Sequence, residues 1–466
     1  MYSSCDYRRR RHHNLGYAEL ITTPLQPENI DEYLKRLFPI SRSIMGNGNR
    51  ETLRVLQELV PISIEEYPSQ TKVYDWTIPG EWSIRSAWIK NSMGVKLVDW
   101  GECNLHVVGY SEPVHQFMNY EQLAKNLHYL DQFPDAVPYR TTYYKKDWGF
   151  CVTGAQNLVL SESKGELEVF IDSTIDDNGS MSIGEIVIPG KKRQEYLVST
   201  YICHPSMAND NLSGVLATAY LAKLMIAEGK PEYSWRFVFV PETIGAIAYL
   251  NHNEQIMKNL LGGFVISCCG GKGRLGHKES FVGNHLVDRA VRLAFRDQEI
   301  EPVRYPFTPD GSDERQYSSP GFRIPVTTIT KDKYYEYSEY HTSLDNLDLV
   351  NGAQILEAIR VYQHAIEILD SNEQIKSKVP FGEPQLSSRG LYPTTGGAIN
   401  QKSSSFKLDH KEVENIDLLT WVMFLADGDT DLVSIAEQSG YRFRDLKEMI
   451  AILRSQDLIE TYQLPN

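Results

Sequence analysis

An apolar run that ends in a histidine, with an aspartate and a helix close behind, constrains the fold of this chain most. Residues 196–203 (YLVSTYIC) have the apolar, β-branched and aromatic composition of a buried strand. His204 and Pro205 follow, and a proline cannot continue a central strand. Asp210 comes shortly afterwards, ahead of an Ala/Leu-rich run at 215–225 that is typical of a helix packed on a sheet. This order predicts an open α/β sheet with two metal-type ligands in the crevice at the carboxyl ends of its strands.

Two more candidate residues follow predicted strands further along the chain. Residues 235–240 (WRFVFV) have the composition of a buried strand, and Glu242 comes directly after Pro241, where a carboxylate can act as a general base or as a ligand. Far downstream, His341 lies in a polar loop before a predicted helix. Taken singly, most histidines are structural or exposed, and an aspartate before a helix is most often a cap. The combined order of His, Asp, Glu and His favours a metallohydrolase-type site.

The spacing of these motifs resembles the zinc-dependent aminopeptidases of the M28 type. In that family a Gly-Ala-Asp-Asp/Asn-x-Ser-Gly motif carries a metal-bridging aspartate, a Glu-Glu-x-Gly motif a base and a ligand, and a Tyr-His-Thr-x-x-Asp motif the last histidine. The matching segments here are 209–214 (NDNLSG), 242–245 (ETIG) and 340–345 (YHTSLD). Residues 311–313 (GSD) and 320–325 (PGFRIP) are similar to the family's Ser-Asp-His and Gly-Ile-Pro segments. The whole chain more narrowly resembles a bacterial aminopeptidase-like branch with an inserted β domain and a C-terminal winged helix.

The resemblance implies a zinc-dependent aminopeptidase-like hydrolase that removes N-terminal residues from peptides. It implies that His204, Asp210 and His341 are metal ligands, because zinc takes imidazole and carboxylate ligands and leaves a position open for water. It also implies that Glu242 is the general base for that metal-bound water. One zinc ion is expected, or two bridged by Asp210. Asp345 is a candidate for holding His341 in one orientation, although helix capping would explain it equally well.

Two positions depart from the family's pattern. The second glutamate, expected directly after the base, is Thr243 here, and a neutral hydroxyl is a poor zinc ligand. The family's later acidic ligand corresponds to Cys268, whose thiolate could complete a three-ligand site with His204 and Asp210. The second site would then keep only Asp210 and His341, unless the general base also ligates. These departures leave two other functions open: an amidase, deacylase or cyclase-like relative on the same fold, and a catalytically degenerate binding or regulatory scaffold.

The length of 466 residues is too great for one ordinary core, so two or three domains are expected. Short aromatic and β-branched runs from residue 74 predict a small all-β unit, and a Gly/Ser/Thr/Pro-rich stretch beyond residue 380 is typical of a linker. A helix-turn-helix pattern with its turn at Gly440 follows. We therefore expect four parts: a zinc-exopeptidase-like α/β catalytic domain at 25–73 and 156–378, whose mixed sheet is flanked by helices; an inserted β-rich domain at 74–155; a linker at 379–406; and a winged-helix-like domain at 407–466.

Two groups of residues near these motifs allow more than one interpretation. The aromatic residues of the insert exceed what a small core needs, so most are expected in that core while some could form the rim of the site; they are Trp76, Trp82, Tyr139, Tyr143, Tyr144 and Trp148. Residues 41–53 are expected to be a loop and a helix start with Asn49 as its cap. The alternative is that Arg42 or Arg50 binds a carboxylate in the cleft.

Charge and cysteine usage limit the expected partners. The net charge of −14 argues against a general polyanion-binding surface. Twelve acidic against six basic residues from 407 onward favour a protein-contact or dimer role for the winged helix over DNA binding, and leave a homo-oligomer open. The six cysteines without a C-x-x-C spacing, and the lack of a secretory signal, predict a cytoplasmic protein with free thiols. No apolar run is long enough for a bilayer, and the basic residues at 8–11 are expected to form a solvated tail. The expected partner is a peptide or small amide substrate.

Overall fold

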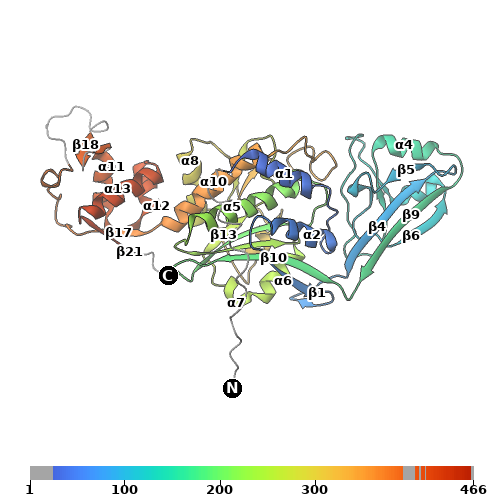
Figure 1. Ribbon diagram of the computed structural model, residues 1–466, viewed down its shortest axis with the longest axis horizontal. Coiled ribbons are helices and arrows are strands. Elements are labelled where there is room, and N and C mark those ends of the chain that lie inside the picture. The colour runs from blue at the N-terminus through green and yellow to red at the C-terminus, as the bar shows by residue number, and fades with distance from the viewer. Residues whose placement is uncertain (1–24, 392–404, 409–410, 415, 463–466) are drawn as a thin grey trace, which may run out of the picture.

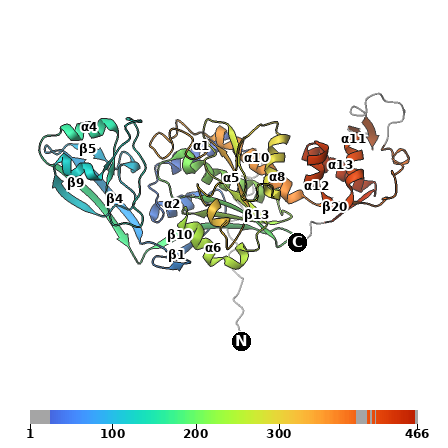
Figure 2. The ribbon, with the colours of Figure 1, turned by 180° about the vertical axis from the view of Figure 1, so that it is seen from behind.

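The computed structural model describes residues 25–391, 405–408, 411–414 and 416–462. A central α/β part lies between a β-rich part at one end and a mainly helical part at the other (Figure 1). The view from behind shows the same three parts in a row (Figure 2). The basic run at 8–11 lies outside the described residues.

The central part is built on an eight-stranded mixed sheet with the order β1-β10-β12-β11-β13-β16-β14-β15. Its strands are β1 (Ser63–Pro68), β10 (Ser180–Ile188), β11 (Glu195–Tyr201), β12 (Ser234–Val240), β13 (Gly262–Val265), β14 (Leu275–Lys278), β15 (Val303–Tyr305) and β16 (Val326–Lys331). The middle strands β12, β11, β13 and β16 run parallel, whereas β10 and β14 pair antiparallel to their neighbours β12 and β16. The predicted mixed sheet flanked by helices is confirmed.

Helices cover both faces of this sheet, which is why β12 is buried along its whole length. They are α1 (Pro27–Leu37), α2 (Asn47–Leu56), α5 (Gly214–Glu228), α6 (Ile244–His252), α7 (Glu254–Met257), α8 (Leu286–Asp297), α9 (Glu314–Tyr317) and α10 (Gly352–Ser371). Alternate residues of β11 point to opposite faces. Val198 belongs to the apolar cluster that holds α1, α5, α8 and α10, whereas Leu197 belongs to the cluster that holds α6.

The β-rich part is a four-stranded antiparallel sheet with the order β5-β4-β9-β6. Its elements are β4 (Glu81–Lys90), β5 (Lys96–Asp99), β6 (Val114–Met118), β9 (Leu167–Asp176), the short pairs β2 (Lys72–Val73) with β3 (Trp76–Thr77) and β7 (Leu127–His128) with β8 (Phe150–Cys151), and the helices α3 (Tyr120–Leu123) and α4 (Gly154–Glu162). Short 3-10 turns lie at Asn104–His106 and Ala124–Asn126. The sequence interpretation ended this insert at residue 155, whereas β9 pairs with β4 and β6, so the inserted sheet reaches Asp176.

The C-terminal part combines three helices with a three-stranded antiparallel sheet, the arrangement of a winged helix. Its elements are β17 (Gln374–Ser377), a 3-10 turn at Ser387–Arg389, the hairpin β18 (Ser405–Leu408) with β19 (Lys411–Glu414), α11 (Ile416–Leu425), β20 (Asp427–Asp431), α12 (Leu432–Ser439), α13 (Phe443–Ser455) and β21 (Ile459–Tyr462). Gly440 ends α12 at a φ of 76°, as the predicted turn requires. The sequence interpretation gave 374–377 to the catalytic domain, but β17 lies between β20 and β21 in this sheet.

Polar contacts fasten the C-terminal part to the central one. Arg289 of α8 lies 2.7 Å from Glu437 of α12. The backbone N–H of Phe443, the first residue of α13, donates to Asp297 at 2.7 Å. Lys447 of α13 lies 2.9 Å from Glu367 of α10. The first turns of α13 therefore face the central part.

The described helices do not include one with the length and apolar character that a membrane crossing requires.

Candidate metal centre

His204, Asp210 and His341 lie together beyond the carboxyl end of β11. One potential ligand atom of each residue lies within 4.8 Å of those of the other two. His341 Nε2 is 2.9 Å from Asp210 Oδ2, and the centroids of the two imidazole rings are 5.4 Å apart. Asp210 is fully buried and His204 nearly so, whereas His341 is partly exposed. The structure thus brings together the three residues that the sequence proposed as metal ligands.

A second carboxylate stabilises the loop that carries Asp210. A π-helical turn at Ala208–Ser213 follows β11 and leads into α5. The side chain of Asp345 accepts the backbone N–H groups of residues 208, 209 and 210 at 3.1, 2.6 and 2.9 Å, and the hydroxyl of Tyr337 at 2.9 Å. Asp345 therefore fixes the loop of Asp210; the sequence interpretation had it orient His341 or cap a helix.

Asn211, next to Asp210, ties the ends of two strands together. Its side-chain amide donates to Thr200 Oγ1 at 2.9 Å and to the carbonyl of Tyr201 at 3.0 Å, at the end of β11. Its carbonyl oxygen accepts the backbone N–H of Cys268, beyond β13, at 3.2 Å. The Tyr201 hydroxyl donates to Asp210 Oδ1. These contacts leave Oδ2 as the Asp210 oxygen that faces His341.

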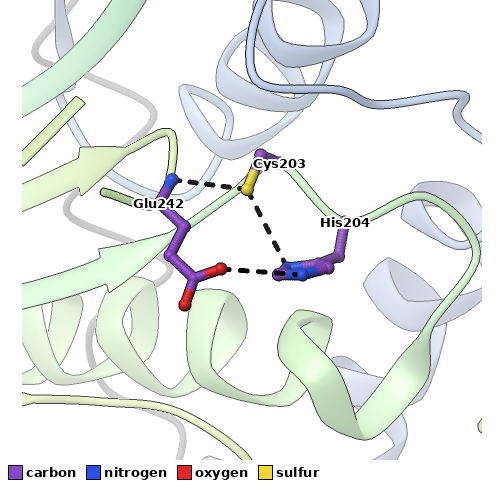
Figure 3. Close-up of side chains that lie close together, drawn as sticks. All are labelled: Cys203, His204 and Glu242. Carbon is purple, nitrogen blue, oxygen red and sulfur yellow. Dashed lines mark hydrogen bonds and ion pairs between the residues drawn. The ribbon is translucent and has the colours of Figure 1, made fainter. Parts of the chain in front are cut away.

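Glu242 lies beyond the end of the neighbouring strand, and its side chain points toward His204. It follows β12, and its Oε2 lies 3.7 Å from His204 Nε2, with 27% of its side chain exposed (Figure 3). Thr243, at φ 64° and ψ −75°, forms the centre of a γ-turn in which Ile244 N–H donates to Glu242 C=O at 2.8 Å. Asp313 accepts the backbone N–H of Thr243 at 2.7 Å. The Asp313 carboxylate thus supports the strained turn that presents Glu242.

Burial and neighbouring charge shift the titration of these groups. Burial lowers the pKa of His204 to about 4, so its imidazole is neutral, the form that binds metals. Although burial works against it, His204 and His341 hold the pKa of Asp210 below its usual range. Burial first, then the charges of Asp313 and Asp210, raise the pKa of Glu242 well above its ordinary value. A bound cation would offset this concentration of carboxylates.

One structural observation supports the binding of a divalent cation by Asp210 and His341. Asp210 Oδ2 and His341 Nε2 are both buried, and neither makes a hydrogen bond, although the two atoms are only 2.9 Å apart. Leaving a buried polar atom without a partner costs about 1–3 kcal/mol. A metal ion between these atoms would satisfy both, and two imidazoles with one carboxylate is a donor set that zinc takes in open sites.

Cys203 and Cys268, the two cysteines discussed near this centre, are less suitable as metal ligands. Cys203 forms a second close group with His204 and Glu242, but its Sγ approaches His204 Nδ1 at 3.9 Å whereas Glu242 approaches Nε2 (Figure 3). Because the two ring nitrogens point in different directions, a single cation cannot use both approaches. Cys268 Sγ lies 3.7 Å from Asp210 Oδ1, and burial raises the pKa of its thiol well above the ordinary value. The close group of described residues around Asp210 contains His341, as expected, and not Cys268, which the sequence offered only as an alternative third ligand.

The arginines singled out in the sequence have structural roles. Arg42 is buried and donates from Nε to the carbonyl of His204 at 2.8 Å, so it fixes the backbone of a candidate ligand. Arg50 pairs with Glu66 and Glu81. The alternative that either binds a substrate carboxylate therefore finds no support. The expected cap was also wrong: Gly46 is the N-cap of α2, and the side chain of Asn49 donates to Ser43 C=O at 2.7 Å.

The inserted domain reaches the centre through Tyr139. The ring of Tyr139 lies 5.2 Å from that of His204 and 5.2 Å from that of His341, edge to face with both. The sequence placed Tyr139 among six aromatic residues of the insert, without a signal to separate it from the others. Its role depends on tertiary contacts with His204 and His341, which lie 65 and 202 residues further along the chain, and local composition does not encode such contacts.

Comparison with known proteins adds a family and a shared fold. Residues 31–372 match the family described as "Domain of unknown function (DUF4910)", and residues 373–461 match a winged helix-turn-helix family. A protein of Clostridium acetobutylicum, named for polysaccharide biosynthesis and an aminopeptidase-like domain, is 39% identical over 427 residues, which cover 92% of this chain and 95% of that protein.

Solved structures agree with this relationship. A crystal structure described as that of a peptidase from Clostridium acetobutylicum aligns with a TM-score of 0.85 and 37% identity over 96% of this chain and 97% of that one. The zinc aminopeptidase BSAP from Bacillus subtilis aligns with a TM-score of 0.54 at 12% identity, over 74% of this chain and 95% of that one. A peptidase M28 precursor from Shewanella amazonensis aligns with a TM-score of 0.52 at 13% identity, over 76% and 95%. The likeness to the latter two lies in the fold, as the sequence motifs predicted. The chain itself belongs to the DUF4910 family and carries a C-terminal winged helix.

Proposed function

We propose that this chain is a zinc-dependent, aminopeptidase-like hydrolase that removes N-terminal residues from peptides. The observation that carries the proposal is the convergence of His204, Asp210 and His341, with buried oxygen and nitrogen atoms that lack hydrogen-bond partners. The fold shared with zinc aminopeptidases supports it. Three mutually close ligands suit one ion, and Thr243 in place of a second glutamate weakens any second site next to it.

A bound zinc ion would polarise the scissile carbonyl and make a nearby water more acidic. Glu242 then acts as the general base: its carboxylate takes a proton from the attacking water and returns it to the nitrogen of the leaving amine. Glu242 suits both steps because burial, together with the charges of Asp313 and Asp210, raises its pKa and favours keeping the proton between the two steps. Asp313 keeps Glu242 in place through the Thr243 N–H.

The test is a screen of aminoacyl-arylamides with protein purified in the presence of zinc or cobalt. The matched control is Glu242→Gln, which keeps the size of the side chain and removes the base. We expect turnover by the wild type and a loss of about 10²–10⁴-fold in the variant, with the metal content unchanged. Equal rates for the two proteins would contradict the proposal.

A second candidate is hydrolysis of an amide bond on a sugar or another small molecule. The name of the Clostridium acetobutylicum relative, which refers to polysaccharide biosynthesis, supports it, and the altered position at Thr243 separates this chain from the family's usual ligand set. Mass spectrometry of a library of amides that includes N-acetylated amino sugars would separate the two candidates. If the supplemented protein held no stoichiometric metal, a binding or regulatory scaffold would be favoured instead.

The proposed location is the cytoplasm. The five described cysteines, Cys103, Cys151, Cys203, Cys268 and Cys269, are all free. Free thiols of this kind suit a reducing compartment.

A further inference from the structure

The inserted domain is joined to both loops that carry the candidate histidines. Asn104 donates from its side chain to the hydroxyl of Ser206, two residues after His204, at 2.8 Å. Residues 137–139 run antiparallel to residues 341–343: the Tyr139 N–H donates to His341 C=O at 2.8 Å, and the Ser343 N–H donates to Val137 C=O at 2.9 Å. The side chain of Ser343 accepts a further bond from Val137 N–H at 2.9 Å. The geometry of both histidine loops therefore depends on the insert.

The backbone at His341 needs this support. His341 has a φ of 55°, in the left-handed region that residues other than glycine rarely adopt. Such a conformation is strained and persists only where the surrounding structure holds it. The bond from Tyr139 N–H to His341 C=O is one of the contacts that hold it.

Among the described aromatic residues that pack against the two imidazoles, Tyr139 alone touches both. Tyr340 stacks on His341 with 3.9 Å between centroids, and Tyr201 meets His204 at 5.1 Å. Tyr139 meets both at 5.2 Å, with interplanar angles of 65° and 89°. Edge-to-face pairs are favourable because the positive edge of one ring meets the negative face of the other, so Tyr139 restrains both imidazoles.

The ring of Tyr139 is itself anchored in the core of the insert. Its hydroxyl lies 2.7 Å from the hydroxyl of Tyr143. The ring of Tyr143 packs edge-on against Tyr110 at 5.5 Å, and Tyr110 stacks on Trp82 at 5.8 Å and donates to Gly80 C=O at 3.0 Å. The hydroxyl of Tyr139 thus lies against Tyr143 of the insert, whereas its ring packs directly against the two imidazoles.

We propose that Tyr139 is a positioning residue that the inserted domain contributes to the metal site of the catalytic domain. It holds the imidazoles of His204 and His341 in place for metal capture, and it does so with its ring and its backbone rather than with its hydroxyl. The inference rests on the proposed function in so far as these two histidines bind the metal. Groups that orient metal ligands without touching the metal typically lower the metal affinity by about 10–100-fold when they are removed.

The experiment is a titration of the metal-free protein with Co²⁺, followed by the visible absorption of the bound ion and by competition with a chelator. Tyr139→Phe keeps the ring and is expected to bind Co²⁺ like the wild type. Tyr139→Leu removes the ring and is expected to lower the affinity by about 10–100-fold and to alter the absorption spectrum. The matched control is Tyr144→Leu in the same loop, whose exposed ring packs against Trp76 and which is expected to leave the affinity unchanged. Urea unfolding of the metal-free variants separates an effect on the site from a loss of folding.

Three outcomes decide the matter. Weaker binding by Tyr139→Leu alone supports the inference, whereas wild-type affinity in that variant overturns it and leaves the proposed function standing. A wild-type protein that binds no Co²⁺ overturns the proposed function instead. If Tyr139→Leu does not fold, Ser343→Ala, which removes the bond from Val137 N–H, takes its place; it is expected to lower the affinity in the same direction, and an unchanged affinity there counts against the inference.

Discussion

Replacing Asp345 with asparagine tests whether the loop of Asp210 depends on a buried carboxylate. Asp345 is fully buried and accepts three backbone N–H groups, those of residues 208–210, and the hydroxyl of Tyr337. An asparagine keeps one oxygen and puts an NH₂ group where the second oxygen was. At least one backbone N–H then faces another donor and has no partner. Both the stability of the protein and the position of Asp210 are expected to suffer.

The size of the effect follows from these bonds. A buried donor left without a partner costs about 1–3 kcal/mol, and each remaining bond weakens because its acceptor no longer carries a charge. We therefore expect Asp345→Asn to lower the free energy of unfolding by about 3 kcal/mol and the affinity for Co²⁺ by about 10–100-fold. Burial raises the pKa of Asp345 to about 7, so urea unfolding and metal titration are best done at pH 8, where the carboxylate is ionised.

Asp288→Asn is the matched control. Asp288 is equally buried and accepts Ser280 N–H at 2.7 Å, the Ser280 hydroxyl at 2.6 Å and His285 N–H at 3.0 Å, far along the chain from the candidate ligands. We expect a similar loss of stability there and no change in Co²⁺ affinity. If Asp345→Asn bound Co²⁺ as tightly as the wild type, the carboxylate would have no part in placing Asp210.

Three further predictions concern the metal, the pH and the backbone. Zn²⁺ at 100 times its Kd should raise the free energy of unfolding by about 2.7 kcal/mol, and His204→Ala should abolish that gain in thermal unfolding; a gain that persisted would exclude His204 as a ligand. Although burial works against it, Asp297 and Glu367 raise the pKa of His364 to about 9, which corresponds to about 3 kcal/mol of stability that is present at pH 6 and lost as the pH rises through 9. His364→Gln should therefore cost that amount at pH 6 and nearly nothing at pH 10, and an equal cost at both would contradict it. Thr243→Gly should raise the free energy of unfolding by about 1 kcal/mol because it relieves the positive φ, whereas Thr243→Ala, measured beside it by urea unfolding, should not.

The sequence was most informative where local pattern and fold agree. The run before His204, the helix after Asp210 and the run before Glu242 became β11, α5 and β12, because strands buried on both faces and the helices that cover them leave long apolar runs. The carboxyl ends of parallel strands meet at one edge of a sheet, so the motifs that follow them converge. The fold class and the resemblance to M28 aminopeptidases were predictable for this reason.

What the sequence missed depends on pairing between distant segments. β9 looks like a strand of the main sheet but pairs with β4 and β6 of the insert, and β17 pairs with β21, about 80 residues further on. A strand's composition shows that it will pair but not with which partner. The same holds for Asp345. Its position in the sequence motif indicates a contact with His341, but its carboxylate accepts hydrogen bonds from the loop of Asp210.

The contact at the start of α13 has a consequence for the winged helix as a whole. In helix-turn-helix proteins that read DNA, the first residues of the second helix enter the major groove, and the positive end of a helix favours anions. Here that end receives the carboxylate of Asp297, and Lys447 one turn on is neutralised by Glu367. Acidic side chains of the central part thus occupy the end of α13 that such proteins turn toward DNA. The acidic groups that neutralise this end of the helix therefore belong to the same polypeptide, and a phosphate backbone would have to replace both contacts to take their position.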